Sequence, residues 1–360
     1  MRILHVITSM KSGGAERLLV DMLPSFRNGG KNQVELLLFD GADMPFLREL
    51  ESRGIKIHKL SQKELFYDPR HIFRMVPYMS RYDIIHTHNT SPQLFTPIAK
   101  LLSFTTKKLV TTEHSTNNRR RGKWWLKPID KWMYNRYAAI VCITEQARHN
   151  LEEYIGQRDN IYTIINGLDT SRFAQPIKDI TGHESFVITM VARFRPEKDH
   201  KTVLEAMKLL PENYRLQFVG DGEGDREDKV KGICTLLGLD DRVTFMGACS
   251  NVPEILAQSD VAVMSSLWEG FGLAAAEAMA AGRPVIATDV TGLRDVVNGA
   301  GLLFPVGDAQ ALANEIKRLC GSPEEYQSVA RRCQERASHY DISKTISKYL
   351  NLYSQLFPEK

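Results

Sequence analysis

The sequence is short of cysteine and has no long apolar run. Its five cysteines are scattered over 360 residues and form no CxxC pair. Their odd number and spacing argue against a disulfide framework and against a zinc site. No apolar run approaches the roughly 20 residues of a transmembrane helix, and the N-terminal MRILHVITSMKSGG is typical of a strand and a loop, not of a signal peptide. We therefore expect a cytoplasmic protein with reduced thiols.

A strong overall charge is also missing. The formal net charge is +4, with 25% charged and 43% hydrophobic residues. Without a strong positive charge or aromatic sheet motifs, nucleic-acid binding is not expected. The charge is uneven, however: residues 1–175 hold 26 Lys and Arg against 17 Asp and Glu, and residues 176–360 hold 21 against 26. The basic first half favours a polyanionic partner or an anionic membrane surface.

Short apolar runs alternate with helix-length segments from end to end. The first half contains ILHVIT, VELLLF, IKIHKL, DIIHTH, KLVTTE and AIVCIT, and the second FVITMVAR, YRLQFVG, RVTFMG, VAVMSS, PVIATDV and GLLFP. This alternation predicts an α/β protein with about six parallel strands in each half. The alternation pauses near residue 171, so we expect two doubly wound domains, 1–170 and 171–340, with a ligand cleft between them. The periodic tail 341–360 is expected to be a helix that packs back on the first domain.

The stretch EGFGLAAAEAMAAGRPVIATDV, residues 269–290, combines a glycine loop, a helix and a strand. The alanine-rich segment is a strong helix former, which Gly282 and Pro284 end. The preceding loop places the N–H groups of Phe271, Gly272 and Leu273 at a helix N-terminus, a position that attracts phosphate. Glu269 and Glu277 flank this position. From this stretch alone, an ordinary helix with two surface glutamates explains the pattern equally well.

Two further loops each follow the first expected strand of one half of the chain. VARFRPEKDH places Arg193 and Lys198 at the carboxyl end of the first strand of the second half, where cations suit a diphosphate. GGAER places Gly13 and Gly14 after the first strand of the chain, at the start of a helix. GGAER is not the GxGxxG fingerprint of dinucleotide binding. Solvated cations and a tight turn are the alternative interpretations.

Histidines end two strands of the first half. His86 and His88 lie two residues apart and share a face, but no third metal ligand with suitable spacing is visible, so a pair in the core or lining the cleft is expected. His114 ends the next strand and is the better catalytic candidate. The acidic segment VGDGEGDREDKVKG has calcium-loop spacing but lacks the required glycine and closing glutamate. We interpret it as an acidic turn and expect no metal site.

Basic residues surround two tryptophans in NNRRRGKWWLKP, residues 117–128. This combination suits the interface of an anionic membrane, and a solvated loop with two core tryptophans is the alternative. The candidate residues for contact with an acceptor or a membrane are Arg119, Arg120, Arg121, Lys123, Trp124 and Trp125.

Six motifs occur in the order found in the GT-B glycosyltransferases of family 4, and the sequence resembles that family over nearly its whole length. They are GGAER, INGLDTSRF, VARFRPEKDH, VGDGEG, VTFMG and EGFGLAAAEAMAAGRPVIATD. The resemblance implies the GT-B fold, with two Rossmann-like domains, an acceptor-binding one first and a nucleotide-sugar-binding one second.

The resemblance also implies roles for the residues of the second half. Glu269 would bind hydroxyls of the donor sugar and Glu277 those of the ribose. Arg193 and Lys198 would neutralise the diphosphate leaving group. The N–H groups of residues 271–273 would face the sugar and diphosphate.

Other matched positions complete the implied site. The backbone of Met246 and Gly247 would meet the base, whereas Gly13 and Gly14 would line the other wall near the phosphates. His114 matches a position at the reacting centre. The expected catalytic residues are therefore Glu269, His114, Arg193 and Lys198.

The implied reaction is transfer of a sugar, with retention at the anomeric carbon, from a UDP-hexose or UDP-N-acetylhexosamine to a glycan or lipid-linked acceptor. Cations and N–H groups would stabilise the charge on the leaving phosphate. Since no DxD motif ends a strand, we expect no metal cofactor. The basic first half predicts peripheral contact with the inner face of the cytoplasmic membrane. A transferase with a soluble acceptor, a UDP-sugar 2-epimerase and a non-catalytic nucleotide-sugar-binding protein are alternatives.

Overall fold

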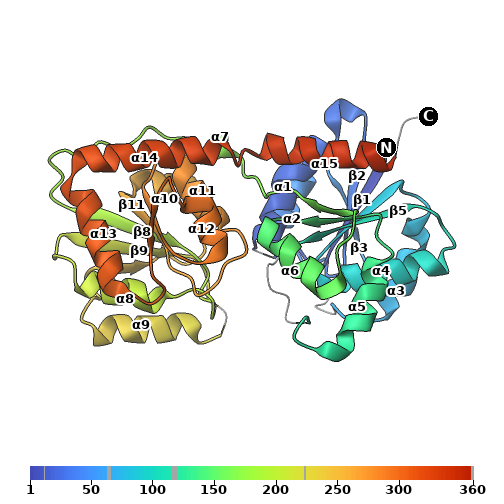
Figure 1. Cartoon of the computed structure of the whole chain (residues 1–360), viewed down its shortest axis with the longest axis horizontal. Coiled ribbons are helices and arrows are strands. Elements are labelled where there is room, and N and C mark those ends of the chain that lie inside the picture. The colour runs from blue at the N-terminus through green and yellow to red at the C-terminus, as the bar shows by residue number, and fades with distance from the viewer. Residues whose placement is uncertain (12, 63–65, 115–119, 223, 358–360) are drawn as a thin grey trace. The chain divides into compact units, whose positions relative to one another are not determined.

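The chain folds into two compact units, each built around its own parallel sheet (Figure 1). A computed structural model describes residues 1–11, 13–62, 66–114, 120–222 and 224–357. Unit 1 comprises Met1–Gly167 and Ile342–Lys360, and unit 2 comprises Leu168–Asp341. The division falls a few residues before the junction expected near residue 171.

Unit 1 has a seven-stranded sheet in the order β3-β2-β1-β4-β5-β6-β7, in which every neighbouring pair is parallel. The sequence pattern predicted six of these strands and missed β7, because three residues inside a loop-like segment show no periodicity. The elements are β1 (Arg2–Ile7), α1 (Gly14–Phe26), the 3-10 helix η1 (Asn28–Gly30), β2 (Gln33–Leu38), α2 (Pro45–Ser52), β3 (Lys56–Lys59), α3 (Arg70–Met79), β4 (Ile84–His88), α4 (Thr90–Leu102), β5 (Lys108–Glu113), the 3-10 helix η2 (Trp124–Leu126), α5 (Lys127–Tyr134), β6 (Ala139–Cys142), α6 (Glu145–Ile155), β7 (Ile161–Thr163) and α15 (Ile342–Leu356).

Unit 2 has a six-stranded parallel sheet in the order β10-β9-β8-β11-β12-β13. All six strands coincide with apolar runs of the sequence. The elements are α7 (Thr170–Phe173), β8 (Phe186–Val191), α8 (His200–Lys208), β9 (Tyr214–Val219), α9 (Arg226–Leu236), β10 (Val243–Phe245), α10 (Val252–Gln258), β11 (Val261–Met264), α11 (Leu273–Ala280), β12 (Val285–Thr288), α12 (Thr291–Val297), β13 (Leu302–Phe304), α13 (Ala309–Gly321) and α14 (Pro323–Ser338).

Helices cover both faces of the unit 1 sheet, so the central strands β1, β4 and β6 are almost completely buried. Residues of α1, α2 and α15 form one core with alternate strand residues. Residues of α3, α4, α5 and α6 form a second core on the opposite face. The α/β architecture expected from the sequence is confirmed.

The last helix, α15, belongs to the core of unit 1, as expected. Its buried side chains include Ile346, Tyr349, Leu352 and Tyr353. The Tyr349 ring packs edge-on against Phe26 of α1, with 6.0 Å between ring centroids. Aromatic burial of this kind is a large contribution to stability, so the C-terminal segment is an integral part of unit 1.

We expect Tyr349→Ala to lower the free energy of unfolding of unit 1 by about 3–5 kcal/mol, because it removes a fully buried aromatic ring. Three of the four tryptophans lie in unit 1, so a Trp268→Phe background makes tryptophan fluorescence report on this unit during urea unfolding. Ser354→Ala, on the exposed side of α15, should change the value by less than about 0.5 kcal/mol. Equal effects of the two substitutions would contradict the packing of α15.

Candidate active site

Lys198 and Glu269 meet beyond the carboxyl ends of β8 and β11, where the strand order of unit 2 reverses. This is where open parallel sheets bind ligands. Lys198 Nζ donates a hydrogen bond to Glu269 Oε2 and lies 3.3 Å from Ser266 Oγ. Both charged side chains are partly exposed. The structure thus joins two residues that are 71 positions apart in the sequence.

Backbone hydrogen bonds hold the two loops that carry this ion pair. Leu267 N donates to Glu197 O at 2.8 Å. Thr288, at the end of β12, accepts from Ser266 N at 3.0 Å and donates to Ser266 O at 2.9 Å through its hydroxyl. The pair is therefore held in place by the strand ends and not by flexible side chains alone.

The N-terminus of α11 lies directly after this loop. The N–H groups of Phe271, Gly272 and Leu273 have no hydrogen-bond acceptor among the residues that the structure describes. Such unpaired N–H groups, reinforced by the helix dipole, form a binding site for an anion. Glu277 lies one turn further along α11 and is partly exposed, whereas most of its helical neighbours are buried.

Two glycines allow this loop to adopt its shape. Gly272 has φ +88°, in the left-handed region, and a Cβ there would lie 2.7 Å from Leu293 Cδ2. A Cβ on Gly292 would lie 2.5 Å from the backbone oxygen of Glu269. The start of α12 therefore packs directly against the backbone of the loop and positions it.

Arg193 is paired within the protein. Its Nε donates to Asp221 Oδ1 at 2.8 Å. The sequence analysis placed Asp221 in an unrelated acidic turn, but β8 and β9 pair in register, with Val191 beside Val219, so the two loops that follow them are neighbours. The positions of both residues just after adjacent strands could have indicated this pair.

The backbone of Met246 and Gly247, expected to meet a base, is already partly engaged. Met246 N donates to Phe218 O at 2.9 Å, and Gly247 O accepts from Gly220 N at 2.8 Å. These bonds continue the pairing of β10 and β9 beyond the strand ends. A base could contact only the remaining backbone groups of the two residues.

In unit 1, Gly13 and Gly14 begin α1 just after β1, as the sequence predicted. Gly13 precedes the helix with an extended backbone and provides no side-chain cap. Its carbonyl accepts the first helical bond, from Arg17 N at 2.9 Å. The first N–H groups of α1 thus lie at the carboxyl edge of the unit 1 sheet, where β1 and β4 form the point of strand reversal.

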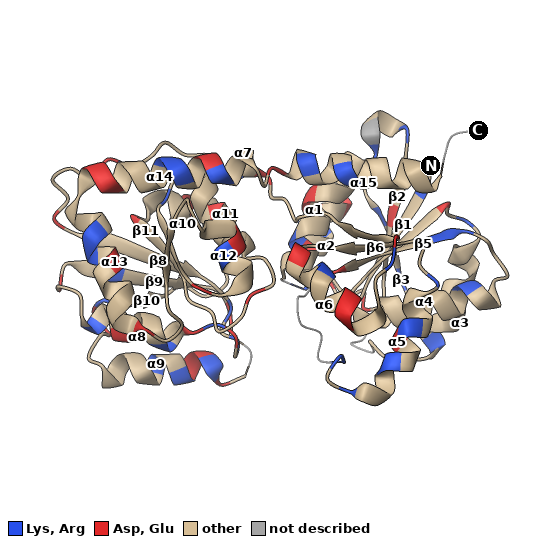
Figure 2. Cartoon of the chain, in the orientation of Figure 1, with Lys and Arg blue, Asp and Glu red and all other residues tan. Residues whose placement is uncertain are grey.

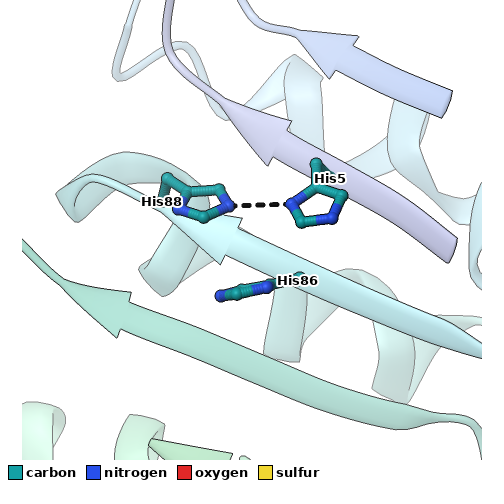
Figure 3. A group of neighbouring side chains, drawn as sticks. All are labelled: His5, His86 and His88. Carbon is teal, nitrogen blue, oxygen red and sulfur yellow. Dashed lines mark hydrogen bonds between the residues drawn. The ribbon is translucent and has the colours of Figure 1, made fainter. Parts of the chain in front are cut away.

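His114 follows β5 and is the outer member of a chain of three imidazoles. Its Nε2 lies 2.9 Å from His88 Nδ1, and His88 Nε2 lies 3.0 Å from His5 Nδ1. His5 belongs to β1 and was not recognised as a candidate. Figure 3 shows His5 and His88 joined by their hydrogen bond, with His86 beside them. A histidine inside the apolar run ILHVIT was the available signal, since few apolar strands bury one.

His86 belongs to a separate buried network. Its Nδ1 lies 2.5 Å from the Tyr353 hydroxyl and its Nε2 lies 2.7 Å from Thr112 Oγ1. The Thr112 hydroxyl also lies 3.1 Å from the Tyr349 hydroxyl. Helix α15 therefore contributes polar as well as apolar contacts to the sheet.

The structure supplies the third histidine that the sequence analysis found missing for a metal site. One nitrogen from each of His5, His86 and His88 lies within 4.8 Å of the others. Both nitrogens of His86 and of His88, however, have protein partners, and all three side chains are fully buried. The arrangement fits a hydrogen-bonded network better than a metal centre.

Burial keeps these histidines neutral. Desolvation lowers the pKa of His5 to about 3 and that of His114 to about 4. The pKa values of His86 and His88 also lie well below the ordinary value, first because of burial and then because of the neighbouring imidazoles. Neutral imidazoles each donate one hydrogen bond and accept one, as the chain requires.

The basic segment before α5 is more paired than its sequence indicated. Arg120 forms an ion pair with Asp130, and Arg121 Nη2 lies 3.2 Å from Glu113 Oε2. These charges are neutralised inside unit 1, which corrects their assignment to an accessible basic surface. Arg119 lies outside the described residues.

The neighbouring Lys123, Trp124 and Trp125 do face solvent. Trp124 is 85% exposed and Trp125 54%, so the alternative of two core tryptophans is wrong. Lys123 Nζ lies 5.8 Å from the centroid of the Trp125 ring. Among the described residues, the helices are either too short or too polar to cross a membrane.

Two parallel sheets with these strand-end sites define a glycosyltransferase of the GT-B type. The sequence model of Glycosyltransferase Family 4 matches residues 12–172, and that of Glycosyl transferases group 1 matches residues 172–337. The protein is a glycosyltransferase and belongs to family 4.

Known proteins agree with this assignment. A UDP-Gal:alpha-D-GlcNAc-diphosphoundecaprenol alpha-1,3-galactosyltransferase of Escherichia coli is 29% identical over 78% of this chain and 77% of its own. An N-acetyl-alpha-D-glucosaminyl L-malate synthase of Bacillus anthracis is 27% identical over 75% of this chain and 74% of its own. The crystal structure of Anabaena Alr3699/HepE with UDP and glucose superposes with a TM-score of 0.87, at 24% identity over 98% of this chain and 99% of that one.

The buried histidines predict a loss of stability in acid. Between pH 4 and 6.5 the unfolded chain binds protons at histidines that stay neutral in the folded protein, so the stability of unit 1 falls as pH falls. His5 alone should cost about 2 kcal/mol between pH 7 and 5.

Urea unfolding of the Trp268→Phe variant across this pH range tests the prediction. His5→Leu should flatten the profile, whereas His149→Gln, at an exposed site on α6, should leave it unchanged. A wild-type profile that is flat down to pH 5 would contradict the burial of neutral imidazoles.

Proposed function

We propose that the protein transfers a sugar from a UDP-hexose or UDP-N-acetylhexosamine to a hydroxyl of a glycan or lipid-linked acceptor in cell-surface polysaccharide synthesis. We further propose that transfer retains the anomeric configuration and needs no metal ion. The observation that carries the proposal is the Lys198–Glu269 pair beside the open N-terminus of α11.

This arrangement suits the chemistry of the reaction. Transfer breaks the bond between the anomeric carbon and a diphosphate, and negative charge develops on the leaving oxygen. Lys198, Arg193 and the N–H groups that start α11 are preorganised donors for that charge. Glu269 provides an acceptor for sugar hydroxyls, and Glu277 provides one for the ribose. Fixed cations at this position would take the place of a metal ion.

The similar proteins support the choice of donor and acceptor. The Escherichia coli relative is named for UDP-Gal and for a diphosphoundecaprenol acceptor, and the structural neighbour holds UDP. A UDP-sugar and a lipid diphosphate acceptor are therefore the first pair to test here.

We expect UDP or its sugars, but not GDP or ADP, to raise the melting temperature of the purified protein, with and without EDTA. Arg193→Ala and Lys198→Ala should each lower kcat by on the order of 10²–10³, while the free energy of unfolding changes by less than about 1 kcal/mol, because both side chains are partly exposed.

Product analysis by NMR then gives the anomeric configuration. Lys201→Ala is a matched control on α8, since Lys201 is more exposed and pairs only with Glu205 in the described structure. Near-normal turnover in both active-site variants, or transfer abolished by EDTA, would contradict the proposed site. Formation of the 2-epimer of the sugar without an acceptor would instead indicate the epimerase.

We also propose that unit 1 contacts an anionic membrane. Trp124 and Trp125 expose large rings. Figure 2 shows basic residues on α5, where Lys131 is exposed, and Lys123 before the helix is exposed as well. Lys123 of this surface lies over the Trp125 ring, which places its charge beside an exposed aromatic group. Aromatic rings beside lysines are typical of a membrane interface.

Trp124→Ser with Trp125→Ser should reduce co-sedimentation with vesicles of phosphatidylglycerol and phosphatidylcholine by about 10-fold, because two amphipathic anchors are lost. Leu236→Ser removes an equally exposed apolar side chain, 87% exposed, from α9 of unit 2 and should have little effect. Binding that ignores both the anionic lipid content and the salt concentration would contradict this proposal.

A further inference from the structure

The chain of three imidazoles joins the interior of the unit 1 sheet to its carboxyl edge. His5 pairs in register with His86 in the neighbouring strand, and His88 and His114 follow on the same face. The contacts are His5 Nδ1 to His88 Nε2 at 3.0 Å and His88 Nδ1 to His114 Nε2 at 2.9 Å. At the two ends, His5 Nε2 and His114 Nδ1 are buried and have no hydrogen-bond partner among the described residues.

A neutral imidazole carries one N–H and one unprotonated nitrogen. If each internal contact is a hydrogen bond, all three rings must point their protons in the same direction along the chain. Only two arrangements exist. Either His5 Nε2 carries a proton and His114 Nδ1 does not, or the reverse holds.

The inner end distinguishes the two arrangements. His5 is completely buried, and its ring stacks on Phe26, with 5.6 Å between centroids. An N–H at either end would be a buried donor without an acceptor among the described residues, and orphaned donors are rarer in proteins than orphaned acceptors. His114, however, is a partly exposed residue at the carboxyl edge of the sheet, where a ligand oxygen can supply the missing acceptor, whereas the fully buried His5 ring cannot gain one. An unprotonated Nε2 on His5 is therefore the less costly choice, and the proton of His5 lies on Nδ1.

From this geometry we infer that His5 and His88 are positioning residues, which fix His114 as the tautomer with its proton on Nδ1. His5 Nδ1–H donates to His88 Nε2, and His88 Nδ1–H donates to His114 Nε2. His114 therefore offers an N–H donor at its outer nitrogen and acts toward a substrate oxygen as a hydrogen-bond donor, not as a base. The inference rests on the proposed function only for the identity of that oxygen, a hydroxyl or phosphate oxygen of the nucleotide sugar.

Tautomers are read directly by long-range ¹H–¹⁵N NMR spectra of the full-length protein labelled at histidine. We expect His114, assigned by comparison with His114→Gln, to show a protonated Nδ1 at pH 7. His88→Leu should shift this ring toward the Nε2–H form that predominates in free histidine side chains. A wild-type His114 protonated on Nε2 would overturn the inference.

Kinetics give a second measurement that a purely structural role would not reproduce. His88→Leu should lower kcat/KM by about 10- to 100-fold, the value of a hydrogen bond to a charged group. His88→Gln should retain the His114 tautomer and most of this activity, because its amide also donates and accepts one hydrogen bond. If His88→Leu fails to fold, His88→Gln and His5→Leu test the same assignment of the proton to His114 Nδ1. The first variant should retain this tautomer, and the second should not.

His86→Gln is the matched control, since His86 is equally buried on the same strand but lies outside the imidazole chain. It should leave the His114 tautomer unchanged. Unchanged tautomer and kcat/KM in both His88→Leu and His5→Leu would overturn the inference. The spectra need no turnover, so failure of the proposed transferase activity would be seen separately from failure of the tautomer assignment.

Discussion

Parallel strand pairing is the constraint on which the candidate sites depend. Because every neighbouring pair of strands in both sheets is parallel, the carboxyl ends of all strands in a sheet lie along one edge. Residues far apart in the chain therefore meet at this edge because their strands are neighbours in the sheet. Lys198 and Glu269 meet because β8 and β11 are neighbours, and Arg193 and Asp221 meet because β8 and β9 are. The loops can vary while the scaffold keeps the meeting point fixed.

The unit 1 sheet shows a different use of the same geometry. The cluster of His5, His86, His88 and His114 would be costly if the rings were charged or left unpaired. Here burial keeps them neutral, and partners from β1, β4, β5 and α15 satisfy most of their nitrogens. The helix that ends the described chain thus completes a polar network as well as an apolar core. Such a network fixes ring orientation, which gives the strand-end histidine a defined chemical character.

Much of the fold was predictable because its signals are local. Twelve of the thirteen strands coincide with apolar runs, and the turn at Gly272 was expected from its glycine. β7 was missed because its three residues are too few to show a periodic pattern of apolar side chains. The pairing of Arg120 and Arg121 with internal carboxylates was also missed, since a charge written in the sequence does not reveal whether its partner lies in solvent or in the core.

By itself, the sequence determined the α/β architecture, the family resemblance and the positions of the strand-end loops, because propensity, periodicity and glycine placement act over a few residues. Only the tertiary structure decided which of those residues touch. The Lys198–Glu269 pair depends on two loops joined by strand order. The chain His5–His88–His114 depends on the register of three strands. Contacts between distant segments are set by pairing and packing of the whole sheet, which no local pattern encodes.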